Sequence, residues 1–78
     1  MTSINHSNKE ELIKLGKKCK QRRQELGLSQ EDFSDKAGLH RTYISQFERG
    51  LRNPTYTTLE KIAATLGISV KDLLETKT

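Results

Sequence analysis

Apolar residues recur three or four positions apart between residues 9 and 26, with charged residues between them and no proline. This spacing puts them on one face of a helix, so it predicts an amphipathic first helix. Gly27 follows the last turn, where a residue that tolerates positive φ ends a helix. Gly16 lies inside the pattern at a cost of up to about 1 kcal/mol relative to alanine, so we expect another helix to cross closely there. The apolar positions are Leu12, Leu15, Cys19 and Leu26.

A capping signal and a very short connection mark the second and third helices. Ser29 can cap the second helix, and Asp32 completes a capping-box pattern three residues later. The connection over residues 38–40 is so short that the third helix must turn sharply against the second. We expect the third helix over residues 41–49, ended by Gly50. The apolar residues of the two helices are Phe33, Ala37, Ile44 and Phe47.

A loop and another glycine bound the fourth helix. Pro54 keeps its predecessor out of helical geometry, so the chain before it forms a loop. Thr55 or Thr57 can cap the helix that follows, and Gly67 closes it. Its inward positions at helical spacing are Leu59, Ile62, Ala63 and Leu66.

The last segment and the chain length complete the expected fold. Ser69 and Asp72 repeat the capping-box pattern and predict a short fifth helix. A chain of 78 residues encloses a single modest core, so we expect one domain. The sequence therefore predicts an all-α fold of five helices over residues 9–75, with a disordered arm at residues 1–8 and a disordered tail at 76–78.

The charge is positive and unevenly distributed. The net charge is +4, and residues 1–27 hold the whole excess, with seven Lys or Arg against three Glu. A basic surface attracts polyanions such as nucleic acid, but it is equally consistent with simple solubility. Charge alone therefore leaves the partner open.

The sequence offers little chemistry for catalysis. Cys19 is the only cysteine, so it forms no intramolecular disulfide or thiolate metal site, which fits a reducing cytoplasm. His6 and His40 have no metal-ligand spacing to other residues, and no glycine-rich phosphate loop is present. The longest apolar run is far shorter than the ~18 residues of a spanning helix. We expect a cytoplasmic protein with no enzymatic activity, cofactor, metal or membrane association.

The most informative block is the second helix, the tight turn and the third helix. In a helix-turn-helix, the second of the two helices presents its N-terminal side chains to base edges in the major groove. Arg can bind guanine bidentately, Gln can bind adenine, and the Thr methyl can contact thymine. The alternative is an ordinary solvated helix face, but the outward positions include no acid, and Glu48 lies near the buried face. These outward positions are Arg41, Thr42, Ser45, Gln46 and Arg49.

Residues from about 15 to 74 resemble the helix-turn-helix domain of phage repressors of the lambda, 434 and Cro type (XRE-type). The resemblance rests on many matches at fixed spacing: Gly16, Arg23, residues 27–33 and 37–39, Ile44, Ser45, residues 48–50, Pro54, Leu59, Ile62, Ala63 and residues 66–68. Within this family, residues 40–45, 48–50 and 52–54 are most similar to the controller proteins of restriction-modification systems. Those are small dimers that bind palindromic operators, and the resemblance implies a similar function for this chain.

The resemblance also implies a role for individual residues. It makes Arg41, Thr42 and Gln46 base readers, with Ser45 on the same face. The residues expected to contact the DNA backbone, or in part a narrow minor groove, are Gln30, His40, Tyr43, Arg49, Arg52 and Asn53. Three of these have simpler interpretations: Tyr43 as half-buried packing, Gln30 as a residue of its own helix start, and Arg52 as a solvated loop residue.

Arg23 and Glu48 match an ion pair between the first and third helices of the resembled repressors. Such a pair would orient the recognition helix, although burying two charges adds little net stability unless their hydrogen bonds are complete. Arg22 departs from the family, where an apolar residue is usual. We expect its stem to cover the core and its head to reach solvent or phosphate.

Acidic residues on the second helix suggest a protein partner. In the resembled activators, acids on this helix contact RNA polymerase, so the same role is open for Glu31, Asp32 and Asp35. Helix capping and compensation of the helix dipole explain them equally simply, and we favour that interpretation.

The last helix carries more apolar residues than one face needs. Some of them are expected to meet a second copy of the chain, in a two-fold dimer that reads an inverted repeat with recognition helices about 34 Å apart. The alternative is that all of them cover the core. The residues are Ile68, Val70, Leu73 and Leu74.

Two other functions remain open from the sequence. An antitoxin or prophage repressor would share the DNA chemistry, and an antitoxin would add a protein partner. A protein-interaction adaptor would use the fold without DNA, and would show no salt-dependent duplex binding.

Overall fold

The computed structural model describes residues 9–75, and they form five α-helices, as the sequence predicts. The predictions of disorder at residues 1–8 and 76–78 lie outside the described residues. No helix within residues 9–75 is long and apolar enough to cross a membrane. The helices are α1 (Lys9–Glu25), α2 (Gln30–Ala37), α3 (Arg41–Glu48), α4 (Tyr56–Leu66) and α5 (Val70–Leu74).

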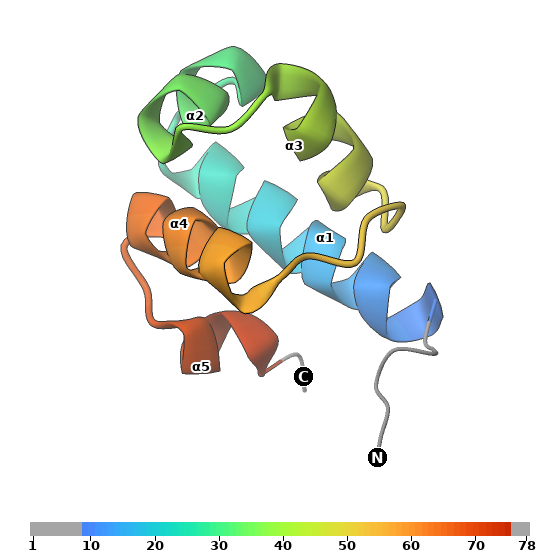
Figure 1. The fold of residues 1–78 in the computed structure, drawn as a ribbon. Helices are drawn as coiled ribbons and strands as arrows, with labels where there is room; N and C mark the ends of the chain where they lie inside the picture. Colours follow the sequence, from blue (N-terminus) through green and yellow to red (C-terminus); the bar gives the residue numbers. More distant parts are fainter. Residues whose placement is uncertain (1–8, 76–78) are drawn as a thin grey trace.

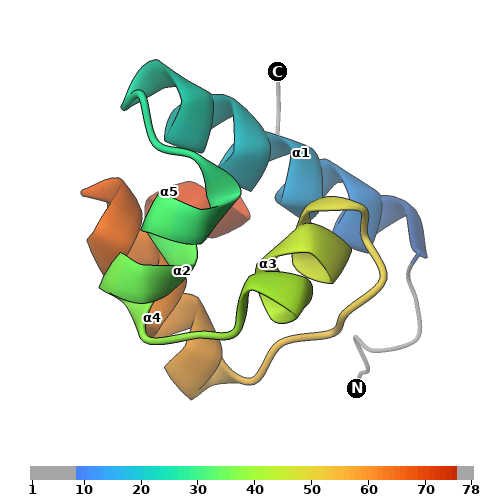
Figure 2. The ribbon, with the colours of Figure 1, turned by 90° about the horizontal axis from the view of Figure 1, so that it is seen from above.

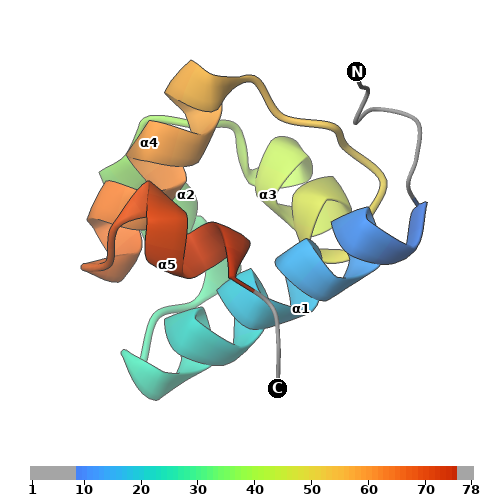
Figure 3. The ribbon, with the colours of Figure 1, turned by 90° about the horizontal axis from the view of Figure 1, so that it is seen from below.

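The long helix α1 runs through the middle of the molecule and contacts α3, α4 and α5 (Figure 1). Helices α2 and α3 lie together on one side of it (Figure 2). Helix α5 lies on the opposite side of α1 (Figure 1), and the view from below shows it packed against α4 and α1 (Figure 3). The α2–α3 pair and the C-terminal helix therefore occupy opposite ends of the fold.

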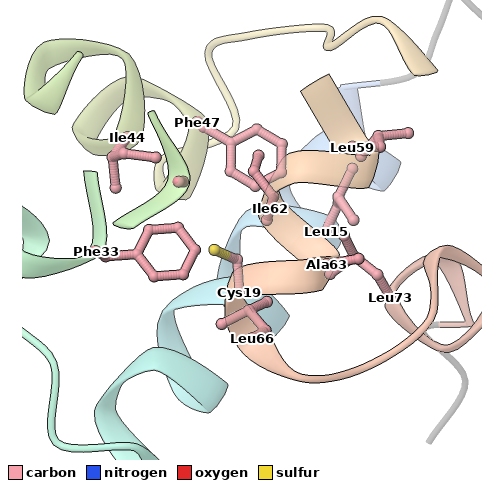
Figure 4. Close-up of a cluster of buried hydrophobic side chains, with 11 residues drawn as sticks. Leu15, Cys19, Phe33, Ile44, Phe47, Leu59, Ile62, Ala63, Leu66 and Leu73 are labelled. Atoms are coloured by element: carbon pink, nitrogen blue, oxygen red, sulfur yellow. The ribbon is translucent and has the colours of Figure 1, made fainter. Parts of the chain in front are cut away.

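One apolar cluster joins all five helices (Figure 4). Its largest fully buried side chains are Phe33 and Phe47, and Cys19 lies among them with no exposed surface. Removing this apolar area from water is the main stabilising contribution in a domain of this size. The other buried members are Leu15, Ala37, Ile44, Leu59, Ile62, Ala63, Leu66 and Leu73.

Caps and glycines set the helix boundaries. The Ser69 hydroxyl accepts a hydrogen bond from the Asp72 N–H at 2.9 Å, which starts α5. Thr55, one of the two predicted candidates, caps α4 by accepting from the Thr58 N–H at 3.2 Å. Gly67 ends α4 with φ +73°, a conformation that costs L-residues with a Cβ about 1–2 kcal/mol.

The structure adds detail to one prediction about the ends of the fold and corrects another. The Arg22 side chain is 37% exposed, and its head also makes contacts within the chain: its Nε donates to the Leu66 carbonyl at 3.1 Å, and Nη1 lies 3.4 Å from Glu25. Its head therefore caps the C-terminal end of α4. Leu73 is fully buried within the chain, so it leaves no surface for a partner. Ile68 and Val70 are half-buried, and Leu74 is 49% exposed.

Candidate nucleic-acid interface

The α2–turn–α3 unit forms as the capping signals predict. The Ser29 hydroxyl accepts from the Asp32 N–H at 2.9 Å, and the Asp32 carboxylate accepts from the Ser29 N–H at 3.4 Å. Helix α2 ends at Gly38 with φ +71°, and the Leu39 N–H then donates to the Ser34 carbonyl at 3.0 Å. His40 follows in extended geometry and α3 begins at the next residue. The turn between the two helices is therefore tight and held by backbone hydrogen bonds.

The outward side of α3 presents polar side chains. Ile44 and Phe47 face the core, with 0% and 1% of their surface exposed. Arg41, Thr42 and Arg49 are exposed, and the other outward residues are half-buried. An open hollow of about 280 Å³ separates this side from the start of α2. It is lined by Gln30, Arg41, Thr42, Ser45, Gln46 and Arg49.

The predicted ion pair between Arg23 and Glu48 is present and bidentate. Arg23 Nε lies 2.6 Å from Glu48 Oε2, and Arg23 Nη2 lies 2.9 Å from Oε1. Arg23 Nη1 also donates to the Leu28 carbonyl at 2.8 Å. Both charged residues are only 6% exposed. The hydrogen bonds to Glu48 raise the pKa of Arg23 above its ordinary value, against the opposing effect of burial.

Gln30 joins this ion pair, which the sequence did not indicate. Its Nε2 donates to Glu48 Oε1 at 3.1 Å, so α1, α2 and α3 meet at one carboxylate. A primary amide has two N–H groups, and the second remains free to donate to a phosphate. The predicted phosphate contact and the structural role are therefore compatible at this residue.

Gly16 allows α1 to approach the end of α3, as its place inside the first helix predicts. A Cβ built there would overlap the Phe47 carbonyl oxygen and lie 2.6 Å from that of Glu48. These are backbone atoms, which cannot move aside as a flexible side chain can. Glycine at this position therefore sets how closely the third helix is held against the first.

Tyr43 and Arg52 form a second contact group at the edge of α3. The Tyr43 ring stacks on Phe47 with ring centroids 6.3 Å apart, and the Arg52 guanidinium lies 5.0 Å from the Tyr43 centroid. Burial raises the pKa of Tyr43, and the charge of Arg52 acts in the opposite direction. Arg52 Nε donates to Gln46 Oε1 at 2.8 Å. Tyr43 is half-buried packing, and its hydroxyl contact to phosphate remains a prediction.

The remaining predicted residues lie in exposed positions. His40 makes no side-chain cap to α3, and Asn53 is exposed in the following loop. Asp32 completes the capping box of α2, and whether it also contacts RNA polymerase stays a prediction. Glu31 and Asp35 are exposed on the same helix. The structure thus gathers the predicted base readers on one face and places the acids on a different helix.

A family model described as helix-turn-helix matches residues 20–73 of the chain. The chain belongs to the helix-turn-helix family. The matched residues run from the middle of α1 into α5, so they include the whole α2–turn–α3 unit. The resemblance to XRE-type regulators is confirmed at this level.

Similar proteins of known sequence are transcription regulators. Control protein C.BamHI of Bacillus amyloliquefaciens is 46% identical over 61 residues, which are 77% of this chain and 75% of that protein. The HTH-type transcriptional regulator SinR of Bacillus subtilis is 42% identical over 64 residues. That match covers 81% of this chain but only 58% of SinR, so the chain spans less than two thirds of that regulator.

Similar solved structures include restriction-modification controller proteins. C.AhdI of Aeromonas hydrophila superposes with a TM-score of 0.79 and 36% identity, over 82% of this chain and 97% of that one. A C.Esp1396I tetramer, solved in complex with its natural 35 base-pair operator, gives a TM-score of 0.74 and 40% identity over 82% and 88%. The all-α fold predicted from the sequence is confirmed.

Proposed function

We propose that this protein is a transcription regulator that binds an inverted-repeat operator as a homodimer and acts in the cytoplasm by binding, without catalysis. Helix α3 would enter the major groove with its outward face toward the bases. The observation that carries the proposal is this face: it offers hydrogen-bonding side chains without an acid, on a helix fixed to the core by Ile44 and Phe47. The operator complex solved for C.Esp1396I supports the same mode of action.

The roles of single residues follow from their positions. Arg41, Thr42, Ser45 and Gln46 line the hollow on the outward side of α3 and would contact base edges. The Arg23–Glu48 pair, buried behind them, would keep α3 in place and make no contact with DNA. The side chains proposed to contact the DNA backbone or a narrow minor groove are Gln30, His40, Tyr43, Arg49, Arg52 and Asn53.

Pairing belongs to the other end of the fold, whereas a further protein partner would contact helix α2. Ile68, Val70 and Leu74 keep apolar surface after the core is formed, and a second copy would cover it. Among the relatives, the controller proteins of restriction-modification systems are the best guide to the regulated genes. A contact with RNA polymerase would use the exposed Glu31 and Asp35 on α2.

Replacing one base reader and one backbone contact tests the proposal. Duplexes selected from a random pool by the purified protein define the operator, and binding should weaken steeply as salt rises. Arg41→Ala should cost about 1–3 kcal/mol on the selected duplex and relax its sequence preference. Tyr43→Phe removes only the hydroxyl and should weaken all sequences similarly.

Two results would contradict the proposal. An equal loss of affinity on selected and random duplexes for Arg41→Ala would remove the base-reading role. The absence of any salt-dependent duplex binding would instead favour an adaptor that uses the fold for protein contacts.

A further inference from the structure

Arg52 and Gln46 form a pair whose chemistry fixes the direction of an amide. Arg52 Nε donates to Gln46 Oε1 at 2.8 Å. A guanidinium carries only donors, so the glutamine amide can meet it only through its oxygen. The Nε2 end of Gln46 is then the free end of the amide. In the hollow on α3, Gln46 therefore offers two N–H donors, and its only remaining acceptor is the second lone pair of an oxygen that Arg52 already engages.

The local backbone brings Arg52 to this place. Gly50, with φ +78°, lets the chain turn back at the end of α3. The Gly50 N–H donates to the Phe47 carbonyl at 3.0 Å, and the Leu51 N–H donates to the Gln46 carbonyl at 2.9 Å. This is the paired bonding of a Schellman motif, which fixes the course of the chain beyond the helix. The next residue, Arg52, consequently lies beside the last turn of α3.

Aromatic contacts hold the Arg52 head in the same position. Its guanidinium lies 5.0 Å from the centroid of the Tyr43 ring, at a distance where cation–π attraction is effective. Tyr43 stacks in turn on Phe47, which is 1% exposed. Because Tyr43 and Gln46 are three residues apart on α3, one side chain can contact both. Arg52 is thus connected to the core through Tyr43 and to the recognition face through Gln46.

The bases differ in what they present to such an amide. Adenine shows an acceptor, N7, beside a donor, N6, and a glutamine reads both with its nitrogen and its oxygen. Guanine shows two acceptors, N7 and O6, and cytosine shows a donor. An amide whose oxygen is held by a guanidinium can donate to both guanine acceptors without disturbing that bond. Pairing with adenine would also require the held oxygen to be shared with the amino group. The adenine pairing expected of a free glutamine is therefore disfavoured.

We propose that Arg52 is a positioning residue that gives Gln46 a preference for guanine over adenine in the operator. This rests on the proposed function, because it assumes that α3 reads base edges. Arg52 acts here through Gln46, in addition to any contact of its own with the DNA backbone. The preference is set before binding, since the pair is present in the protein without DNA.

Selection from random duplexes by the wild type and by Gln46→Ala identifies the position that Gln46 reads, as the one whose preference disappears. Binding is then measured on duplexes carrying each of the four base pairs there. We expect the wild type to bind a guanine-containing pair at least about fivefold more tightly than an A·T or T·A pair, the effect of one hydrogen bond. Arg52→Ala should reduce that ratio about fivefold or invert it, beyond any general loss of affinity.

Two further variants separate positioning from charge. Arg52→Lys keeps a donor for the Gln46 oxygen and should retain the guanine preference. Arg49→Ala removes the same charge from an exposed neighbour that lines the hollow, and should weaken all four duplexes alike. Thermal unfolding of each variant, followed by circular dichroism, should match the wild type closely, because both arginines are exposed.

The possible failures point to different conclusions. If the wild type selects no duplex, the proposed function and this inference fall together. Suppose that the wild type selects an operator. If Gln46→Ala then alters the base preference at no position, or if the wild type prefers A·T or T·A at the position that Gln46 reads, Arg52 does not set the base preference of Gln46. An unchanged profile over the four base pairs in Arg52→Ala would likewise overturn the inference and leave operator binding intact.

Discussion

Glu48 connects the buried part of this protein to helix α3, which is proposed to read the bases. Its carboxylate accepts hydrogen bonds from Arg23 and Gln30, and Oε2 lies 3.9 Å from the Cys19 sulfur. Within residues 9–75 no buried side-chain nitrogen or oxygen lacks a hydrogen-bond partner. A buried charge pair is tolerated only when its hydrogen bonds are complete, as they are here. The thiol donates a long hydrogen bond to the same carboxylate, so its titration depends on its burial and on the charge of Glu48.

Cys19 should make stability fall at alkaline pH. Burial first, and then the charge of Glu48, raise the pKa of the thiol from 9.0 to about 12. Below pH 9 the thiol is protonated in both states, so it has no effect on the pH dependence. Between pH 9 and about 12 only the unfolded chain releases the proton, so folding loses up to about 1.4 kcal/mol per pH unit.

Urea unfolding of the wild type and of Cys19→Ala, from pH 8 to about 10.5, isolates this effect. The two proteins share all other titrating groups, so the difference between their free energies of unfolding reports the thiol. We expect that difference to shift against the wild type as pH rises above 9. Curves that stay parallel would mean that the thiol ionises as easily in the folded protein as in the unfolded chain.

At the scale of elements, local signals predicted the helices well. Ser29, Thr55 and Ser69 each accept the capping hydrogen bond that their position suggests, and the helix ends fall within a residue of those expected. The bond between Arg52 and Gln46 was not predictable, because it depends on how the loop after α3 folds back. The same is true of Gln30, whose link to Glu48 exists only when α2 and α3 are packed together.

Gly16→Ala should test whether packing or helix propensity determines the change in stability at the crossing of α1 and α3. Propensity alone would stabilise α1 by up to about 1 kcal/mol. The new Cβ would instead lie 2.6 Å from the Glu48 carbonyl oxygen, and overpacking of this kind costs about 1–3 kcal/mol. We therefore expect a net loss of stability in chemical unfolding, with amide shifts in α3 that mark its displacement.

Gly27→Ala is the matched control for this substitution. No atom lies within 4 Å of a Cβ built at Gly27, so its φ of +73° is the only source of strain, about 1–2 kcal/mol. Its effect on amide shifts should stay local to the end of α1. If Gly16→Ala proved more stable than the wild type, the close crossing would not exist in solution.

At the scale of the whole molecule, the fold separates two surfaces. Helices α2 and α3 lie on one side of α1 and α5 lies on the other (Figure 1). Lys18 holds α5 to α1 by donating to the carbonyls of Asp72 and Glu75. The sequence pattern identified α5 as unusually apolar, but it could not tell Leu73 from Leu74. Their burial differs because only the first faces the core, and adjacent helical positions point about 100° apart.

Leu74→Glu should therefore separate the chain into single copies if α5 forms the dimer. A carboxylate placed in an apolar interface loses its hydration without gaining a partner, which disfavours pairing. In sedimentation velocity we expect the variant to remain monomeric at concentrations where the wild type is dimeric. Leu51→Glu, at a leucine that is 59% exposed in the loop after α3, should sediment as the wild type does.

The same variant connects pairing with operator binding. A dimer engages both halves of an inverted repeat, and the second contact adds about 10²–10⁴ in affinity over a single half-site. Leu74→Glu should bind the full repeat hardly better than a half-site, while its affinity for the half-site stays that of the wild type because α3 is untouched. If Leu74→Glu instead kept the full-repeat advantage, the second copy would have to dock on a surface other than α5. One chain has a single recognition helix, so it cannot contact both half-sites by itself.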